Sequence, residues 1–284
     1  MIKEKESPDL ILLNGGIAIH HADWNWKGIN SPFARLYLVR EGKAKVLMNN
    51  LEYELKPLHL YLIPPFTLHG YECDEYFSLY YFHIYEKQTS SLRVLEELAY
   101  PFEIQASVHD IHLIERLLEI NPGKELRRYD PSFYDNTPTL IQSITNDTRS
   151  PYYLSIETKG VIYQLISRFM MNAAYKLEIT DNRILKVLHH IRKNIEKLIT
   201  IEELSALCYL SNDHFIRLFK KEIGYTPMQY INRKKVEKAQ LMLITTKLSI
   251  KDIAYNLSFN NVSYFNRLFK KITGQTPGNY IQMT

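Results

Sequence analysis

Apolar residues recur twice with the spacing of an amphipathic helix in the C-terminal part of this 284-residue chain. Phe215, Leu218 and Phe219 stand at positions i, i+3 and i+4, which places their side chains on one face of a helix. Residues 213–230 and 263–280 match at 10 of 18 positions without a gap, so the second segment repeats the same apolar face. The chain therefore contains a duplicated helical unit rather than the longer array of a solenoid.

The residues that follow each repeated face indicate where its helix ends and where another begins. Gly224 and Gly274 come after a basic last turn, a position at which glycine commonly ends a helix in the left-handed conformation. The Thr-Pro pairs at 226–227 and 276–277 then supply an N-cap and a first-turn proline. Each repeat is therefore predicted to end sharply and to be followed by a new helix.

A shorter helix is predicted before each repeat, because Thr200 and Ser249 can cap the segments 201–207 and 250–257. A tight turn separates this helix from the repeated one, whose outer side carries polar and basic residues. Helix, short turn and second helix in this order form the plan of a helix-turn-helix. The two units are placed at about residues 201–222 and 250–272.

Residues from about 10 to 86 show short apolar segments separated by turn signals. Three of these segments, with their turns, are 35–40 before Glu41-Gly42, 45–48 before Asn49-Asn50, and 60–63 before Pro64-Pro65. Strands at this spacing predict a β-barrel or jelly roll. Helical spacing returns from about 90 to 178. The expected fold is α+β, with a barrel over 1–90, a helical linker or dimerisation segment over 91–180, and an all-α module over 181–284.

Charge is distributed unevenly along the chain, although the net charge is only +4. Residues 181–284 contain 17 Lys and Arg against 8 Asp and Glu, a net charge of +9. The remaining residues contain 18 against 23, a net charge of −5. A basic module attached to an acidic one is typical of nucleic-acid binding.

The sequence shows no sign of a membrane or secretory destination. Its first residues are charged and lack the apolar segment of a signal peptide, and no apolar run approaches the roughly 18 residues that cross a bilayer. The two cysteines, Cys73 and Cys208, are too few for a disulfide framework or a zinc site. We therefore expect a cytoplasmic protein.

The C-terminal module, over about residues 181–284, resembles the DNA-binding domain of the AraC/XylS family of bacterial transcription regulators. The residues that carry the resemblance are 263–271, Gly274 and Thr276-Pro277, and in the first copy 215–221, Gly224 and Thr226-Pro227. Ser258 departs from the pattern, because the family commonly has glycine there. The resemblance implies a bihelical domain whose central helix, about 227–243, holds two reading helices in successive major grooves of double-stranded DNA.

The resemblance and the position of each side chain on its helix indicate which residues meet DNA. The candidates for base contacts are Asn212, Asp213, Ile216 and Arg217 in the first unit and Asn261, Ser263, Asn266 and Arg267 in the second. In the major groove Arg matches guanine, Asn matches adenine, Asp accepts from cytosine, and Ile can meet a thymine methyl group. The candidates for phosphate contacts are Lys220, Lys221, Arg233, Lys234, Lys235, Lys270 and Lys271.

Residues 36–72 resemble the cupin-like sensor domain of the same family, with Leu58-His59 and Phe66 where the family commonly has Gly-Asp and Gly. Aromatic and polar side chains in this half are suited to line a pocket for a small polar effector such as a sugar. They are Trp24, Trp26, Arg35, Tyr37, His69, Tyr80 and His83. A barrel filled by its own side chains, without a ligand, is the alternative.

These observations predict a sequence-specific regulator of transcription that responds to a ligand, and the resemblance implies a homodimer. A cupin enzyme with a DNA-binding tail is the alternative from another class. However, the sequence lacks the His-x-His pair followed by Glu of a metal-dependent cupin, and it carries no nucleophile or nucleotide-binding motif. No catalytic residue, metal site or cofactor is therefore predicted. A regulator controlled by a partner protein stays open as a further alternative.

Overall fold

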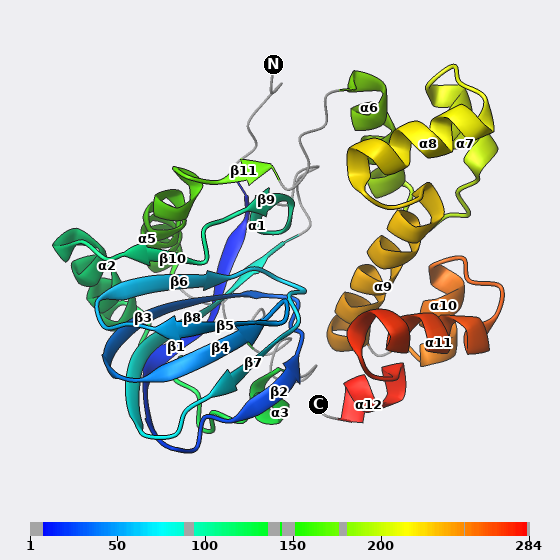
Figure 1. Cartoon of the computed structure of the whole chain (residues 1–284). Coiled ribbons are helices and arrows are strands. Elements are labelled where there is room, and N and C mark those ends of the chain that lie inside the picture. The colour runs from blue at the N-terminus through cyan, green and yellow to red at the C-terminus, as the bar shows by residue number, and fades with distance from the viewer. Residues whose placement is uncertain are drawn as a thin grey trace. The chain divides into compact units, whose positions relative to one another are not determined.

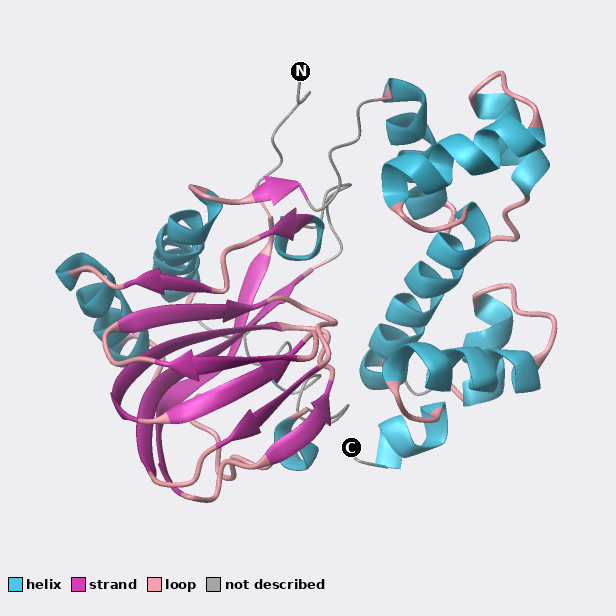
Figure 2. Ribbon diagram, in the orientation of Figure 1, coloured by secondary structure: helices cyan, strands magenta, loops and turns pink. Residues whose placement is uncertain are grey.

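A computed structural model of the chain describes residues 8–87, 94–135, 143, 151–175, 181–246 and 248–282. The chain divides into two compact units, Met1–Ala174 and Tyr175–Gln282 (Figure 1). The first unit is built mainly of strands and the second of helices (Figure 2). This architecture confirms the predicted α+β class. Within the described residues, no helix is both long and apolar enough to span a membrane.

The first unit contains two antiparallel sheets of the kind predicted from the spaced strands. The larger sheet has the order β1 (Leu10–His21), β8 (Tyr76–Glu86), β3 (Ala34–Gly42), β6 (His59–Ile63) and β10 (Glu103–Gln105). The smaller sheet has the order β2 (Trp26–Ile29), β7 (His69–Glu72), β4 (Ala44–Met48) and β5 (Leu51–Leu55). A third, two-stranded sheet pairs β9 (Leu98–Ala99) with β11 (Ala174–Tyr175).

Side chains alternate across the strands and build two separate cores in this unit. On β8, Phe77, Leu79 and Tyr81 belong to the cluster that includes residues of both sheets. Phe82 and Ile84 belong to the second cluster, on the other side of the larger sheet. This alternation follows from the period of two along a strand. The helices of the unit are α1 (Val94–Glu97), α2 (Val108–Glu119), α3 (Pro131–Tyr134) and α5 (Tyr152–Met170), and α2 and α5 cover the second cluster (Figure 1).

The turns of the first unit explain two departures from the family pattern. Leu58 and Phe66 replace glycine and still adopt left-handed backbone, with φ of 60° and 56°. Asn49 and Asn50, at φ of 54° and 61°, form the predicted turn between β4 and β5, where asparagine tolerates this conformation. Leu58 and Phe66 therefore adopt backbone that glycine takes at a lower cost, which leaves local strain at both residues.

The second unit consists of seven helices within its described residues. They are α6 (Asn182–Lys193), α7 (Ile201–Leu207), α8 (Asn212–Ile223), α9 (Pro227–Thr245), α10 (Ile250–Asn256), α11 (Val262–Thr273) and α12 (Pro277–Gln282). The pairs α7–α8 and α10–α11 are the two predicted helix-turn-helix units, and α9 joins them (Figure 1). Asp181, the first residue of the predicted all-α module, caps α6 because its side chain accepts from the backbone N–H of Arg183.

Local signals in the sequence place the ends of these helices correctly. The side chains of Thr200 and Thr226 accept from backbone N–H groups and cap α7 and α9. Gly224 and Gly274 end α8 and α11 in the left-handed conformation, with φ of 81° and 86°. The apolar faces of α8 and α11 are buried, as the repeated spacing predicted.

Both helix-turn-helix turns contain a residue other than glycine in left-handed backbone. Tyr209 follows α7 and Ser258 follows α10, each with a φ of 55°. The serine that departs from the family pattern therefore keeps the expected turn. Its Oγ also donates to the backbone carbonyl of Glu196 at 2.6 Å, which offsets part of the conformational cost.

Substitution of Tyr209 by glycine is expected to raise the free energy of unfolding of the helical unit by about 0.5–1 kcal/mol. The Tyr209 side chain is 96% exposed, so its removal relieves backbone strain and loses little packing. Guanidinium unfolding of the full-length protein measures the change. Tyr255→Gly, at a half-exposed position inside α10, is the control and should lower stability by about 1 kcal/mol. A Tyr209→Gly protein less stable than the wild type would contradict the prediction.

Candidate functional site

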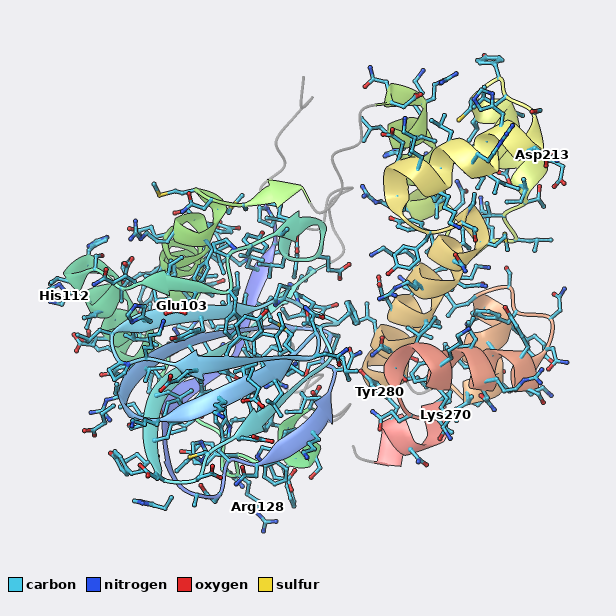
Figure 3. All side chains as sticks on the ribbon, viewed as in Figure 1. Glu103, His112, Arg128, Asp213, Lys270 and Tyr280 are labelled. Atoms are coloured by element: carbon cyan, nitrogen blue, oxygen red, sulfur yellow. The ribbon has the colours of Figure 1, made fainter. Side chains whose placement is uncertain are left out.

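Two matching rows of polar side chains lie on exposed faces of α8 and α11. The exposed residues are Asp213, Arg217, Lys220 and Lys221 on α8, and Ser263, Arg267, Lys270 and Lys271 on α11. Asp213 and Lys270 are labelled in Figure 3. These positions correspond in the two repeats, because the phenylalanine pairs of both helices are buried on the opposite side. Each unit therefore presents a polar helix surface with cationic groups to solvent.

Two of the residues predicted to contact bases, Asn212 and Asn261, form side-chain hydrogen bonds within their own helix-turn-helix. Asn212 accepts from the Ser205 hydroxyl at 2.7 Å and donates to Glu202 at 3.4 Å, which ties the start of α8 to α7. Asn261 is the N-cap of α11 and accepts from the Tyr264 backbone at 3.0 Å. The structure thus gives both side chains a role in anchoring the N-terminal ends of α8 and α11.

Ile216 and Asn266 occupy the same place in the two repeats and are only half exposed. Ile216 packs against the core of the first helix-turn-helix. The Oδ1 atom of Asn266 is buried, and no hydrogen-bond partner for it lies among the residues that the structure describes. These two side chains lie at the border between each core and its exposed face.

The three basic residues at 233–235 on α9 form side-chain contacts within the helical unit. Arg233 donates to the Tyr225 hydroxyl at 3.2 Å, and Lys234 pairs with Glu237 at 2.7 Å. Lys235 is buried, and its ammonium donates to two backbone carbonyl groups. The prediction of a phosphate contact at Lys235 is therefore wrong, because the helix turns this side chain inward.

We call the first unit, Met1–Ala174, the barrel unit, because its two larger sheets share one core. In this unit the buried guanidinium of Arg35 on β3 contacts a group of polar side chains. It donates to His83 at 3.0 Å, to the Tyr134 hydroxyl at 2.9 Å and to Ser31 at 2.6 Å. It also forms an ion pair with Asp135 at 3.3 Å, and Ser31 donates to the same carboxylate. We call these five residues, from β3, β8, the segment before β3 and the end of α3, the Arg35 cluster.

A second chain of hydrogen bonds lies in the same interior. Nδ1 of His69 lies 2.7 Å from the Thr67 carbonyl, which can only accept, so Nδ1 carries the proton. Nε2 must then accept from the Tyr71 hydroxyl at 2.9 Å, and Tyr71 in turn accepts from Tyr37 at 2.6 Å. Trp24 stacks on the Tyr71 ring with centroids 3.9 Å apart. The predicted pocket residues Trp24, Tyr37 and His69 therefore meet around Tyr71.

Burial and the Arg35 charge keep both histidines neutral. Desolvation lowers the pKa of His69 to about 3, and it lowers the pKa of His83 well below its usual value. Burial also raises the pKa of the Asp135 carboxyl to about 6, although Arg35 acts in the opposite direction. The interior thus holds the Arg35–Asp135 ion pair together with neutral imidazole rings and hydroxyl groups, all of which can form hydrogen bonds.

Tyr80 is not part of this interior, although it was predicted to line the pocket. It is three residues from His83 on β8, so its side chain projects from the opposite face and packs against the helix-covered core. Trp26 is half-buried at the start of β2 and packs against the inner cluster. Among the described residues, no group of three or more His, Cys, Asp or Glu is placed to hold a metal ion.

Two segments of the chain match known family models. Residues 204–283 match a helix-turn-helix domain, and residues 16–120 match the AraC-like ligand binding domain. The chain belongs to the AraC/XylS family of transcription regulators. As a member of this family it is a DNA-binding transcription regulator with a ligand-binding domain, as the sequence predicted.

The chain is also similar to individual proteins. The chain is 26% identical to the uncharacterised HTH-type transcriptional regulator YfiF of Bacillus subtilis over 233 residues, which are 79% of this chain and 68% of that protein. It is 25% identical to the lactose operon transcription activator of Staphylococcus xylosus over 122 residues, 43% of this chain and 44% of that protein. The structure of ToxT from Vibrio cholerae shares the fold, with a TM-score of 0.51 and 16% identity over 95% of this chain and 98% of that one.

Sequence reasoning missed several interior residues of this AraC/XylS chain. Tyr71 could have been predicted from the sequence, because it stands two positions after His69 on the same strand and its side chain must lie on the same face. No local pattern indicated Tyr134 and Asp135, because they contact Arg35 from about one hundred residues further along the chain. Only the folded path of the segment after α2 brings them into the barrel.

Proposed function

We propose that one chain reads two successive major grooves of double-stranded DNA, with α8 in one groove and α11 in the next. The observation that carries this proposal is the pair of matching exposed faces described above. The central helix α9 has 19 residues, a length of roughly 28 Å at about 1.5 Å per residue. This length is close to the helical repeat of DNA, roughly 34 Å.

The exposed side chains divide into two roles in this proposal. Arg217 and Arg267 have exposed guanidinium groups, whose terminal N–H pairs match guanine O6 and N7, and Asp213 can accept from cytosine N4. The Nε of Arg217 also donates to the backbone carbonyl of Asp213 at 3.4 Å. The lysine pairs near the end of each reading helix, at 220–221 and 270–271, contact phosphates and position the helix without specifying sequence. Asn212 ties the start of α8 to α7, whereas Asn261 caps the start of α11, so both help to position the reading helices.

We further propose that a small polar ligand, such as a sugar, binds inside the barrel beside Arg35 and controls DNA binding. Predicted pocket residues from different strands gather there, and their hydroxyl and imidazole groups can both donate and accept. Such a ligand changes operator occupancy only by its difference in affinity between two states of the protein. The homodimer implied by the family resemblance remains a prediction.

Selection of binding sites from random duplex DNA with the full-length protein tests the DNA-reading proposal. The wild type should enrich two short blocks about one helical turn apart, roughly 10 base pairs. Arg217→Ala should randomise one block and Arg267→Ala the other, because each side chain belongs to one reading helix. Arg127→Ala, an exposed arginine of the barrel unit, is the matched control and should leave both blocks intact. Two single variants that still enrich both blocks would contradict the proposal.

A further inference from the structure

The ammonium group of Lys235 lies at a junction between the two helix-turn-helix units. Lys235 is near the middle of α9 and is only 5% exposed. Its Nζ donates to the carbonyl of Lys197 at 3.0 Å and to the carbonyl of Leu257 at 2.6 Å. Lys197 precedes α7 of the first helix-turn-helix, whereas Leu257 is the C-cap of α10 in the second helix-turn-helix. One side chain therefore binds the backbone of both halves.

Two further contacts join the same segments. The Ser258 hydroxyl donates to the carbonyl of Glu196 at 2.6 Å. The carboxylate of Glu196 also forms an ion pair with Lys238, one helical turn after Lys235 on α9, at 3.4 Å. Residues 196–197 thus contact the turn of the second helix-turn-helix directly, and they also contact α9.

The buried ammonium of Lys235 favours one arrangement of the two helix-turn-helix units over others. Removal of the charge from water is unfavourable, and burial accordingly lowers the pKa of Lys235. The Lys197 and Leu257 carbonyls compensate for the lost hydration only while both converge on Nζ. A rotation or bend that moved one helix-turn-helix relative to the other would leave the buried Lys235 ammonium with an incomplete set of acceptors.

We propose that Lys235 is a positioning residue that fixes α8 relative to α11, and thereby sets the distance between the two DNA blocks that one chain reads. This inference rests on the proposed function of both helices as reading helices. It goes beyond that function because it names the side chain that determines spacing without contacting DNA.

Binding to a series of duplexes tests the inference. The two blocks are kept and the separation between them is changed by one or two base pairs in either direction. The wild type should prefer its own spacing, whereas Lys235→Met should lose about tenfold or more of that preference. Binding to a duplex with a single block should be nearly unchanged, and Lys235→Arg should restore part of the preference. Lys234→Met removes the same charge one position away and should keep the wild-type spacing profile.

Two outcomes of this series would overturn the inference. One is a folded Lys235→Met protein with the spacing preference of the wild type, and the other is an equal loss of preference in Lys234→Met. If Lys235→Met fails to fold, Ser258→Ala decides, because it removes a contact from the other side of the junction and leaves Lys235 in place. An unchanged preference in Ser258→Ala would then reject the inference.

A distance measurement tests the role of Lys235 at the junction independently of DNA binding. Spin labels at the exposed, equivalent positions 221 and 271 of the full-length protein, with Cys73 and Cys208 replaced, report the separation of α8 and α11. The wild type should give one narrow distance distribution and Lys235→Met a broader one. Equal widths would reject the junction. Failure of the wild type to select two blocks, together with a broader distribution in the variant, would reject the DNA-reading proposal and with it the role in spacing.

Discussion

Replacement of Arg35 by methionine is expected to lower the free energy of unfolding of the barrel unit by about 3–5 kcal/mol at pH 7.5. Methionine fills a similar volume but leaves the largely buried Asp135 carboxylate without its cation. It also removes the donor to His83, Tyr134 and Ser31, so that several buried polar groups lose a partner together. Denaturant unfolding of the full-length protein, followed through the transition of the barrel unit, measures the change.

The effect of pH separates loss of the ion pair from simple loss of packing. Burial raises the pKa of Asp135 to about 6, so the folded state binds this proton more tightly than the unfolded state. Its contribution to stability is therefore complete below the unfolded pKa of about 4 and is lost as pH rises through 6. Without Arg35 the pKa should rise further, because the guanidinium no longer favours the charged form. Arg35→Met should thus be less destabilising at pH 5 than at pH 7.5.

A second substitution provides the control for this prediction. Asp135→Asn added to Arg35→Met removes the unpaired carboxylate and should recover about half of the lost stability at pH 7.5. The double variant should also lose most of the difference between pH 5 and pH 7.5. Equal destabilisation of Arg35→Met at both pH values, with no recovery in the double variant, would show that the ion pair is not what Arg35 contributes.

Simultaneous replacement of Arg217 and Arg267 by alanine is expected to weaken binding to the selected two-block duplex by about 100- to 10,000-fold. Each bidentate contact to guanine contributes about 1–3 kcal/mol of discrimination. The two residues lie on different helices, so their effects should add. Both side chains are exposed, and their removal should leave the fold unchanged. Titration of labelled duplex at fixed salt measures the affinity.

A matched pair of lysine substitutions distinguishes base reading from general electrostatic attraction. Lys220→Ala with Lys270→Ala removes the same number of charges from the same two helices. It should weaken binding to specific and random duplexes by similar factors and reduce the dependence of affinity on salt. The arginine variant should instead lose its preference for the specific duplex. If both pairs lowered specific and random binding equally, the arginines would act only as charges.

The sequence was sufficient for the helical unit because the signals that build it are local. The spacing of Phe215 and Phe219 defines the buried face of α8, and Gly224 and Thr226 mark where α8 ends and α9 begins. The same residue types recur fifty positions later, so the duplication and the exposed basic faces followed from the chain itself. Burial of one face decides which side chains the other face presents, and this accounts for the correct placement of Arg217 and Arg267.

Local patterns were less reliable where several elements compete for one side chain. Lys235 lies in a basic run that is typical of a solvated helix face, yet two backbone carbonyls from other segments bind it in the interior. Asn212 and Asn261 have the amide chemistry of base readers, and their Oδ1 atoms also accept hydrogen bonds within their own helix-turn-helix. Residue type showed what each side chain could bind, and packing determined what it does bind.

The barrel interior shows where the tertiary structure alone decided the outcome. Arg35, Tyr37, His69 and His83 were predicted together from their residue types, and the strands do bring them into one interior. Strand geometry excludes Tyr80, because a side chain three positions from His83 must project from the other face of β8. The counter-ion of Arg35 comes from the end of α3, far along the chain. Contacts between distant segments depend on the path of the whole chain, so no local pattern of residues encodes them.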